Sequence, residues 1–143
     1  MKFLLCVMAL FVSTVSYAAT WTEVARGKNG FKVYIDMDSV SIYDKQITVW
    51  TKSTYKTAQK LKNGKLYNYT IARYIYDCAS KRVKLLEETD YTNNGASVNS
   101  WSSPYQNTYL GDSYGWNNII PDSVADIISN PKTGICQWVQ NQS

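Results

Sequence analysis

The stretch LYNYTIARYIYDC, residues 66–78, decides the fold. It is long and rich in aromatic and β-branched side chains, which is typical of a β-strand. A second run of the same character, KRVKLLEETDYT at 81–92, follows after only two residues. Two such runs joined so closely predict an antiparallel hairpin.

Shorter strands are expected on both sides of this hairpin. In the runs 31–35 and 47–52, every second residue is apolar or β-branched, so in a strand these side chains would share one face. Asn63-Gly64 and Asn94-Gly95 are the dipeptides expected in tight turns, and the second leads into a short strand at 96–101. The first two thirds of the chain therefore predict an antiparallel sheet.

The C-terminal third has a different character. Glycine, serine, asparagine and tyrosine dominate residues 102–118, which predicts a long loop. A short helix is expected next, with Pro121 in its first turn, Asp122 near its positive end and Asn130-Pro131 after it. Its apolar side chains have helical spacing: Val124, Ile127 and Ile128. Because so short a helix is unstable alone in water, its apolar stripe must pack on the sheet.

The N-terminal residues have the pattern of a cleaved signal peptide. A positive start precedes an apolar run at 3–12, and Ser16 and Ala18 fit the −3 and −1 positions of the cleavage site. The run is too short for a membrane span, which needs about 20 residues. We therefore expect residues 1–18 to be removed and residues 19–143 to form one exported domain, of an ordinary size for a single domain.

The net charge and the residue before Cys6 further limit the class of protein and its expected location. Fourteen basic and eleven acidic side chains remain after cleavage, with no run of five like charges, so a nucleic-acid partner is not expected. Cys6 is preceded by Leu5, where a lipobox needs a small residue. A periplasmic protein and a secreted or surface-exposed protein are both consistent with this pattern, and neither the ligand nor the oligomeric state follows from it.

Only two cysteines, Cys78 and Cys136, follow the cleavage site. An oxidising compartment favours one disulfide between them, and two free buried thiols are the alternative. The bond would stabilise the fold by roughly 4 kcal/mol and would link the C-terminal helix to the end of the long strand. The expected fold class is thus α+β: a single antiparallel β-sheet with a short C-terminal helix tethered to it by a disulfide.

Asp36 and Asp38 follow a strand with the spacing of the acidic pair in phosphatases of the haloacid-dehalogenase superfamily. That chemistry needs a parallel sheet with crossover helices and a second acidic pair for magnesium. The later pair Glu87-Glu88 lies on a strand, where neighbouring side chains face opposite sides. We expect instead that Asp38 and Ser39 bond their own backbone in a turn.

Other catalytic and metal-binding classes lack their residues. The chain has no histidine, which excludes Ser-His-Asp and Cys-His catalysis and every zinc site that contains histidine. Two cysteines cannot form a four-sulfur metal site. We therefore expect no enzyme, no cofactor and no metal.

Two surface groups remain as candidates for binding a protein. The first is a set of aromatic side chains in the segment 101–118: Trp101, Tyr105, Tyr109, Tyr114 and Trp116. Such rings among small polar residues suit a protein-binding surface, although they could also fold back over the sheet. The second is a group of lysines near Asn63-Gly64, of which Lys52 and Lys56 are the leading candidates. They suit an acidic partner or an anionic lipid, or they only keep exposed strands soluble.

Several of these motifs occur together in an order that resembles one family. VYIDMDSV at 33–40 comes first, then Asp77-Cys78 with basic residues after it, then Gly95 before a strand, and then WNNIIPDSVADII at 116–128 followed by Cys136. In this order they resemble the surface-adhesin protein E-like family of bacterial exported proteins.

The resemblance implies both a fold and a function. Members of that family have one antiparallel sheet and a C-terminal helix that a disulfide holds against it. They act as adhesins that bind host matrix and serum proteins and not as enzymes. A non-catalytic exported binding module that contacts a protein through the sheet face or the aromatic loop is therefore the leading hypothesis. The alternatives are a soluble periplasmic structural or assembly protein with a bacterial partner and, with low weight, the phosphatase.

Overall fold

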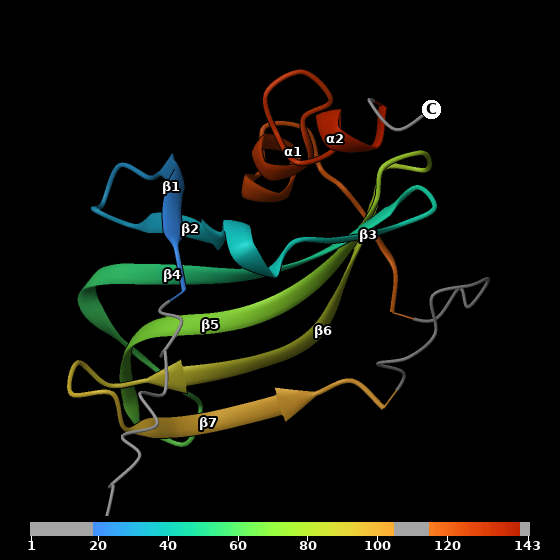
Figure 1. The fold of residues 1–143 in the computed structure, drawn as a ribbon. Helices are drawn as coiled ribbons and strands as arrows, with labels where there is room; N and C mark the ends of the chain where they lie inside the picture. Colours follow the sequence, from blue (N-terminus) through green and yellow to red (C-terminus); the bar gives the residue numbers. More distant parts are fainter. Residues whose placement is uncertain (1–18, 105–114, 141–143) are drawn as a thin grey trace, which may run out of the picture.

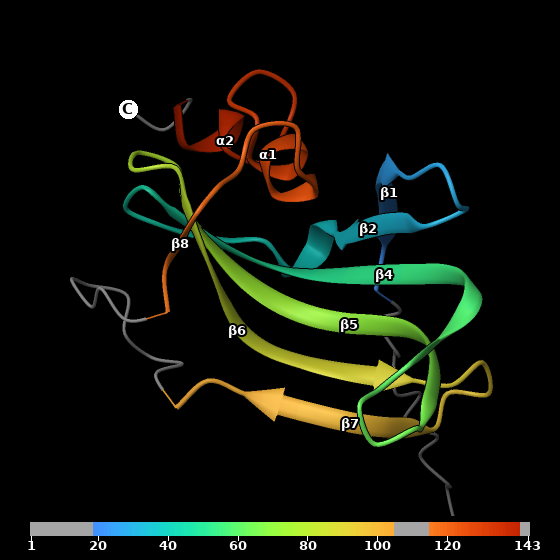
Figure 2. The ribbon, with the colours of Figure 1, turned by 180° about the vertical axis from the view of Figure 1, so that it is seen from behind.

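Six strands lie side by side in one antiparallel sheet, in the order β1-β2-β4-β5-β6-β7 (Figure 1). The structure is a computed structural model that describes residues 19–104 and 115–140. The strands on this path are β1 Trp21–Arg26, β2 Lys32–Asp36, β4 Gln46–Lys60, β5 Leu66–Asp77, β6 Arg82–Tyr91 and β7 Ser97–Ser102. Two short strands complete the sheet: β3 Ser41–Tyr43 pairs with β4, and β8 Asn117–Asn118 pairs with β6. The sheet is strongly curved (Figure 2).

The long hairpin of β5 and β6 is confirmed. These strands are antiparallel neighbours, with Tyr76 opposite Val83 near the turn and Tyr69 opposite Tyr91 at the far end. The register shifts once, between Arg73 and Tyr74. β4 is longer than its alternating core predicted, because it continues through an irregular stretch after Thr54 and pairs again with β5 beyond it.

The core lies on one face of the sheet. Alternation on β2 and β4 directs four side chains to that face, and Tyr76 of β5 and two C-terminal isoleucines pack against them. Each of these seven side chains is at most 4 % exposed: Val33, Ile35, Ile47, Val49, Tyr76, Ile128 and Ile135. Full burial stabilises the fold by about 1.5–3 kcal/mol for each aliphatic side chain. The two described helices pack on this side, which we call the helix face, and we call the other side the open face.

The C-terminal helix is confirmed, but its start is not where the sequence suggested. α1 Val124–Ser129 begins after Ser123, whose hydroxyl accepts a hydrogen bond from the Asp126 amide at 3.2 Å. The expectation that Pro121 lies in the first turn was wrong, because the intervening Asp122 has a φ of 62°, which no right-handed helix allows. A second helix, α2 Gln137–Gln140, was not expected. None of the helices among the described residues is long and apolar enough to cross a membrane.

The segment expected as one aromatic loop is divided differently. Trp101 belongs to β7, which was expected at 96–101 and lies one residue later. Asn117–Asn118, at the other end of the segment, forms β8 beside β6. Residues 105–114, between these two strands, lie outside the described residues.

The disulfide is confirmed. Cys78 and Cys136 are joined by an S–S bond of 2.01 Å, and their Cα atoms are 5.6 Å apart. Cys78 directly follows β5, and Cys136 directly precedes α2. The bond therefore links the C-terminal helices to the turn of the central hairpin.

Candidate functional site

The paired aspartates form a turn. Asp36 ends β2, and its carboxylate accepts a hydrogen bond from the Asp38 amide at 3.2 Å. The Ser39 hydroxyl donates to the Asp36 carbonyl at 2.7 Å and accepts from the Trp50 amide at 3.1 Å. The turn was expected, but the bonded carboxylate belongs to Asp36 and not to Asp38. These groups close the 3₁₀ turn Met37–Ser39 and connect it to β4.

The second acidic pair does not assemble a metal site. Glu87 and Glu88 face opposite sides of β6, and the Glu87 carboxylate pairs with Arg73 at 2.7 Å. Among the described residues, no three side chains of histidine, cysteine, aspartate or glutamate gather in a way that could hold a metal ion.

The open face carries aromatic rings and cations side by side. Lys52 lies between two rings, with its Nζ 6.0 Å from the centroid of Trp21 and 4.8 Å from that of Tyr69. Tyr69 stacks on Tyr91 of the next strand, with centroids 5.0 Å apart and planes 9° from parallel. Four strands therefore contribute neighbouring side chains to one surface.

A second group lies beside the first on the same face. The register places Trp50, Arg73 and Glu87 in one row across β4, β5 and β6. The Arg73 guanidinium lies 5.6 Å from the Trp50 ring centroid while it pairs with the Glu87 carboxylate. We call the two groups together the aromatic–cation surface: Trp21, Trp50, Lys52, Tyr69, Arg73, Glu87 and Tyr91.

These contacts hold the side chains in fixed positions. The aromatic members are half-buried, so part of each ring remains accessible while its neighbours restrict its rotation. A cation over an aromatic face contributes about 0.5–1 kcal/mol at an exposed site. The surface can bind a partner with little loss of side-chain entropy, because most of its order exists before binding.

The candidate residues nominated from the sequence do not gather in one place. Lys52 is a central member of the aromatic–cation surface, but Lys56 lies farther along β4, packed on Gly30. Trp101 is 45 % exposed and pairs with Glu88, which places it on the helix-face side of the edge strand. Trp116 lies 5.2 Å from the Arg82 guanidinium, near β8. Three nominated rings lie outside the described residues: Tyr105, Tyr109 and Tyr114.

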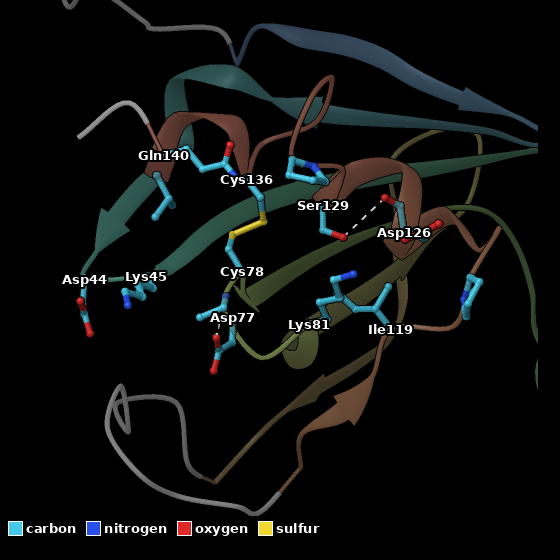
Figure 3. Close-up of a pocket in the computed structure, with 14 residues that line it drawn as sticks. Asp44, Lys45, Asp77, Cys78, Lys81, Ile119, Asp126, Ser129, Cys136 and Gln140 are labelled. Atoms are coloured by element: carbon cyan, nitrogen blue, oxygen red, sulfur yellow. Dashed lines mark hydrogen bonds between the residues drawn. A yellow bond between two sulfur atoms is a disulfide. The ribbon is translucent and has the colours of Figure 1, made fainter. Parts of the chain in front are cut away.

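A cavity of about 700 Å³ opens beside the disulfide (Figure 3). The β3–β4 turn, the β5–β6 turn and the C-terminal helices enclose it, and the two cysteines form part of its wall. Its charged members come from these turns and from α1: Asp44, Lys45, Asp77, Lys81 and Asp126. Two of the carboxylates already serve the backbone, since Asp126 accepts from the Asp122 amide at 3.1 Å and Asp77 closes the hairpin turn.

Both oxygens of the Asp77 carboxylate accept hydrogen bonds. Its Oδ1 accepts from the Ala79 and Ser80 amides at 3.1 and 2.9 Å, and its Oδ2 accepts from Arg82 at 3.2 Å. Burial alone would raise the pKa of Asp77, but the hydrogen bonds from Ser80 and Arg82 outweigh it and lower the pKa. Asp77 is therefore a charged turn residue whose two carboxylate oxygens both accept hydrogen bonds.

Replacing Asp77 should have a pH-dependent cost. A depressed folded-state pKa stabilises the protein above the unfolded-state pKa of about 3.9, and this contribution is lost as the pH falls through the folded value. We expect Asp77→Asn to lower the free energy of unfolding by about 1–2 kcal/mol at pH 7, with the difference shrinking at pH 3. Urea unfolding at both pH values measures it. Asp44→Asn, in the exposed neighbouring turn, is the control, and an equal Asp77→Asn deficit at both pH values would contradict the assignment.

Comparison with known proteins identifies the relatives of this fold. The family described as surface-adhesin protein E matches residues 21–131, which is most of the chain. The chain belongs to this family. The match spans the whole sheet and α1, so the family resemblance expected from the order of the motifs is confirmed.

A solved relative shows the same fold. The crystal structure of protein E from non-typeable Haemophilus influenzae is 10 % identical, with a TM-score of 0.50 over 91 % of this chain and 94 % of that one. At this identity the likeness speaks for the fold alone. No curated protein matches the chain.

Proposed function

We propose that this member of the surface-adhesin protein E family is an exported, non-catalytic binding protein. Its partner is a protein, of the host matrix or serum class, and the contact is made by the aromatic–cation surface of the open face. In this proposal residues 1–18 are a leader that is removed, and residues 19–143 form the single binding domain. The observation that carries the proposal is the arrangement of Trp21, Lys52 and Tyr69, a cation held between two rings on an accessible sheet face.

The composition of this surface supports contact with a protein. Tryptophan, tyrosine and arginine are the residue types that most often dominate binding energy at protein interfaces. Here they occur on one face, with Trp50 and Arg73 in a row across β4 and β5, and Tyr69 and Tyr91 in another row across β5 and β6. The described helices occupy the other face, so a partner could approach without displacing them.

The open face is a better candidate than the aromatic segment 101–118. Trp101 of that segment lies on β7, whereas Trp116 lies beside the Arg82 guanidinium, so the two described tryptophans have different surroundings. Trp101 faces the helix side of β7, away from the aromatic–cation surface. It therefore serves as a matched control for a tryptophan of the open face.

Substitutions on the two faces should separate these surfaces. We expect Trp50→Ala and Lys52→Glu each to weaken binding at least tenfold, because truncating a central interface residue costs about 2 kcal/mol or more. Trp101→Ala should change binding less than threefold. Biolayer interferometry against an array of purified host matrix and serum proteins measures the change, and circular dichroism checks the fold. Equal losses from Trp50→Ala and Trp101→Ala would overturn the choice of face.

The location of the protein tests the other half of the proposal. Protease added to intact cells should cleave a surface-displayed adhesin, whereas a periplasmic protein would be cut only after the outer membrane is opened. Complete protection on intact cells would favour the alternative, a periplasmic assembly protein with a bacterial partner. The open face would then still be the surface to test, with periplasmic extract in place of host proteins.

A further inference from the structure

One end of the sheet carries an unbalanced positive charge. The β1–β2 turn, residues 27–31, and the far part of the β4–β5 hairpin, residues 55–67, together contain five lysines and no aspartate or glutamate. All five are exposed: Lys28, Lys56, Lys60, Lys62 and Lys65. None of the ion pairs found among the described residues includes any of them. We call these two segments the basic tip.

The two segments meet near Lys56, and the hairpin turn at 60–66 lies farther along the same end of the sheet, toward β7 (Figures 1 and 2). Lys32 pairs with Thr54, so the β1–β2 turn lies beside the start of the irregular stretch of β4. Atoms of the Lys56 side chain lie 3.1–3.2 Å from the point where a side chain at Gly30 would begin. Both views place this end of the sheet opposite the turns near the disulfide (Figures 1 and 2).

The other end of the sheet does not share this imbalance. Its basic side chains have carboxylates near them, since Asp44 adjoins Lys45 in the β3–β4 turn and Asp77 pairs with Arg82 at 3.2 Å. The excess positive charge of the chain is thus concentrated at the basic tip. Lysines spread evenly for solubility would not leave such a difference between two ends of one sheet.

The hairpin turn within the basic tip is firmly built. The Leu61 amide donates to the Lys65 carbonyl and the Gly64 amide to the Leu61 carbonyl, both at 2.9 Å. The Asn63 side chain accepts from the Lys65 amide at 3.1 Å, and Gly64 takes a φ of 86° that favours glycine. The sequence KLKNGKL at 60–66 therefore presents its lysines from a defined loop.

This turn also exposes an apolar side chain. Leu66, opposite Lys60 at the end of the ladder, is 54 % exposed. An exposed leucine between lysines does not improve solubility, and it offers nothing to a purely ionic ligand. It does suit a ligand that has a layer of negative charge and an apolar layer directly beneath it.

We propose that the basic tip docks the protein on the surface of a bilayer rich in anionic phospholipid. The five lysines lie at the headgroup phosphates, and Leu66 enters the boundary between headgroups and acyl chains. Tyr55 and Tyr67, whose rings are 5.6 Å apart at the base of the tip, have the amphipathic character that suits this interface. Electrostatic attraction combined with a small buried apolar area is how peripheral proteins bind such membranes.

An acidic polysaccharide is the competing partner, and the structure favours the bilayer. Lysines are hydrated point charges without the planar fork of arginine, so they do not require a fixed pattern of anionic groups. They can therefore contact a fluid layer of phosphates as readily as they contact the sulfates of a sugar chain. Leu66 distinguishes the two, because a sugar chain in water would leave it as exposed as before. The role of this side chain is therefore the decisive measurement.

Vesicle binding by the full-length mature protein tests the proposal. Co-sedimentation with phosphatidylglycerol–phosphatidylcholine vesicles at 0.1 M salt should show binding, and pure phosphatidylcholine vesicles should show none. Replacing Lys60, Lys62 and Lys65 by glutamine should weaken binding about a hundredfold, because each lysine near an anionic surface increases the binding constant by a similar factor and three such factors are lost. Salt at 1 M should release the protein, because it shortens the screening length from about 10 Å to about 3 Å.

A matched triple variant controls for net charge. Replacing Lys45, Lys81 and Lys132 together by glutamine removes the same charge from the opposite end of the sheet. This variant should bind vesicles within threefold of the unchanged protein. Leu66→Ser should weaken binding about tenfold through loss of the apolar contact. Neither change touches the aromatic–cation surface, and Trp50→Ala should bind vesicles normally, so this proposal and the proposed function fail or succeed separately.

Three outcomes would overturn the proposal. They are equal losses from the two triple variants, no effect of Leu66→Ser, and binding to immobilised heparin without binding to anionic vesicles. The last of these would assign the basic tip to an acidic polysaccharide. A dye attached at Leu66→Cys adds a direct readout, because its emission should shift to the blue on phosphatidylglycerol vesicles and stay unchanged with heparin.

Discussion

Removing the disulfide should lower the free energy of unfolding by about 4 kcal/mol, on the chain-entropy account of a cross-link that closes a long loop. Cys78 and Cys136 are 58 residues apart, so the bond removes many conformations from the unfolded chain. The variant to use is Cys78→Ala with Cys136→Ala, which leaves no free thiol to form other bonds. Chemical denaturation of the double variant beside the oxidised protein measures the difference.

The loss should begin at the C-terminal helices. α1 and α2 are short, and the described part of this unit is anchored in the core mainly by Ile128 and Ile135. We expect amide exchange in residues 124–140 to accelerate before exchange in β4 and β5, because the sheet keeps its ladder and most of its core. Uniform acceleration across the sheet and helices would show that the bond stabilises the whole fold as one unit. The wild-type protein after mild reduction should behave as the double variant does.

The main features of the fold could be predicted because they depend on strong local patterns. The run at 66–78 and its partner at 81–92 are long enough for their composition to specify strands, and only two residues separate them. The disulfide could be predicted because Cys78 and Cys136 are the only cysteines after the expected cleavage site. The antiparallel sheet with a tethered helix is therefore confirmed by the structure.

The elements that were missed carry weak local signals. β3 has three residues, β8 has two and α2 has four, so none is long enough to show a period. β1, WTEVAR, mixes charged and apolar side chains because it is an edge strand with exposed positions on it. Its place beside β2 is decided by pairing, which composition does not reveal.

The aromatic–cation surface was missed for a different reason. Each member was visible in the sequence, but Trp50, Arg73 and Glu87 become neighbours only through the register of three strands. One slipped residue would turn a strand's side chains to the other face. The sequence signal for this surface is the set of polar and aromatic residues that alternate with the core residues of each strand. The prediction of the fold used only the apolar residues of that alternation. Lys52 was nominated for its charge, and its position between two rings needed the structure.

The second large effect is expected from Gly134→Ala. Gly134 lies in the loop that returns from α1 toward Cys136, and a Cβ atom there would lie 2.2 Å from the Ile128 carbonyl oxygen and 2.6 Å from the Asn130 amide nitrogen. Both contacts are with backbone atoms, so no side chain can move aside to relieve them. The loop must shift, and we expect the free energy of unfolding to fall by about 3–5 kcal/mol.

The size of this effect follows from what the loop holds in place. The Gly134 amide donates to the Asn130 carbonyl and the Ile135 amide to the Ile128 carbonyl, both at 2.8 Å, and Ile135 is only 1 % exposed. Displacing the loop strains these bonds and draws Ile135 out of the core. Gly27→Ala is the matched control, since a Cβ there would make ordinary contact with Phe31 at 3.4 Å and the cost should stay below about 1 kcal/mol. Thermal and urea unfolding of the two variants, with the disulfide intact in both, should therefore differ widely. Equal stability of the two would mean that the loop yields to a methyl group without disturbing the core beneath it.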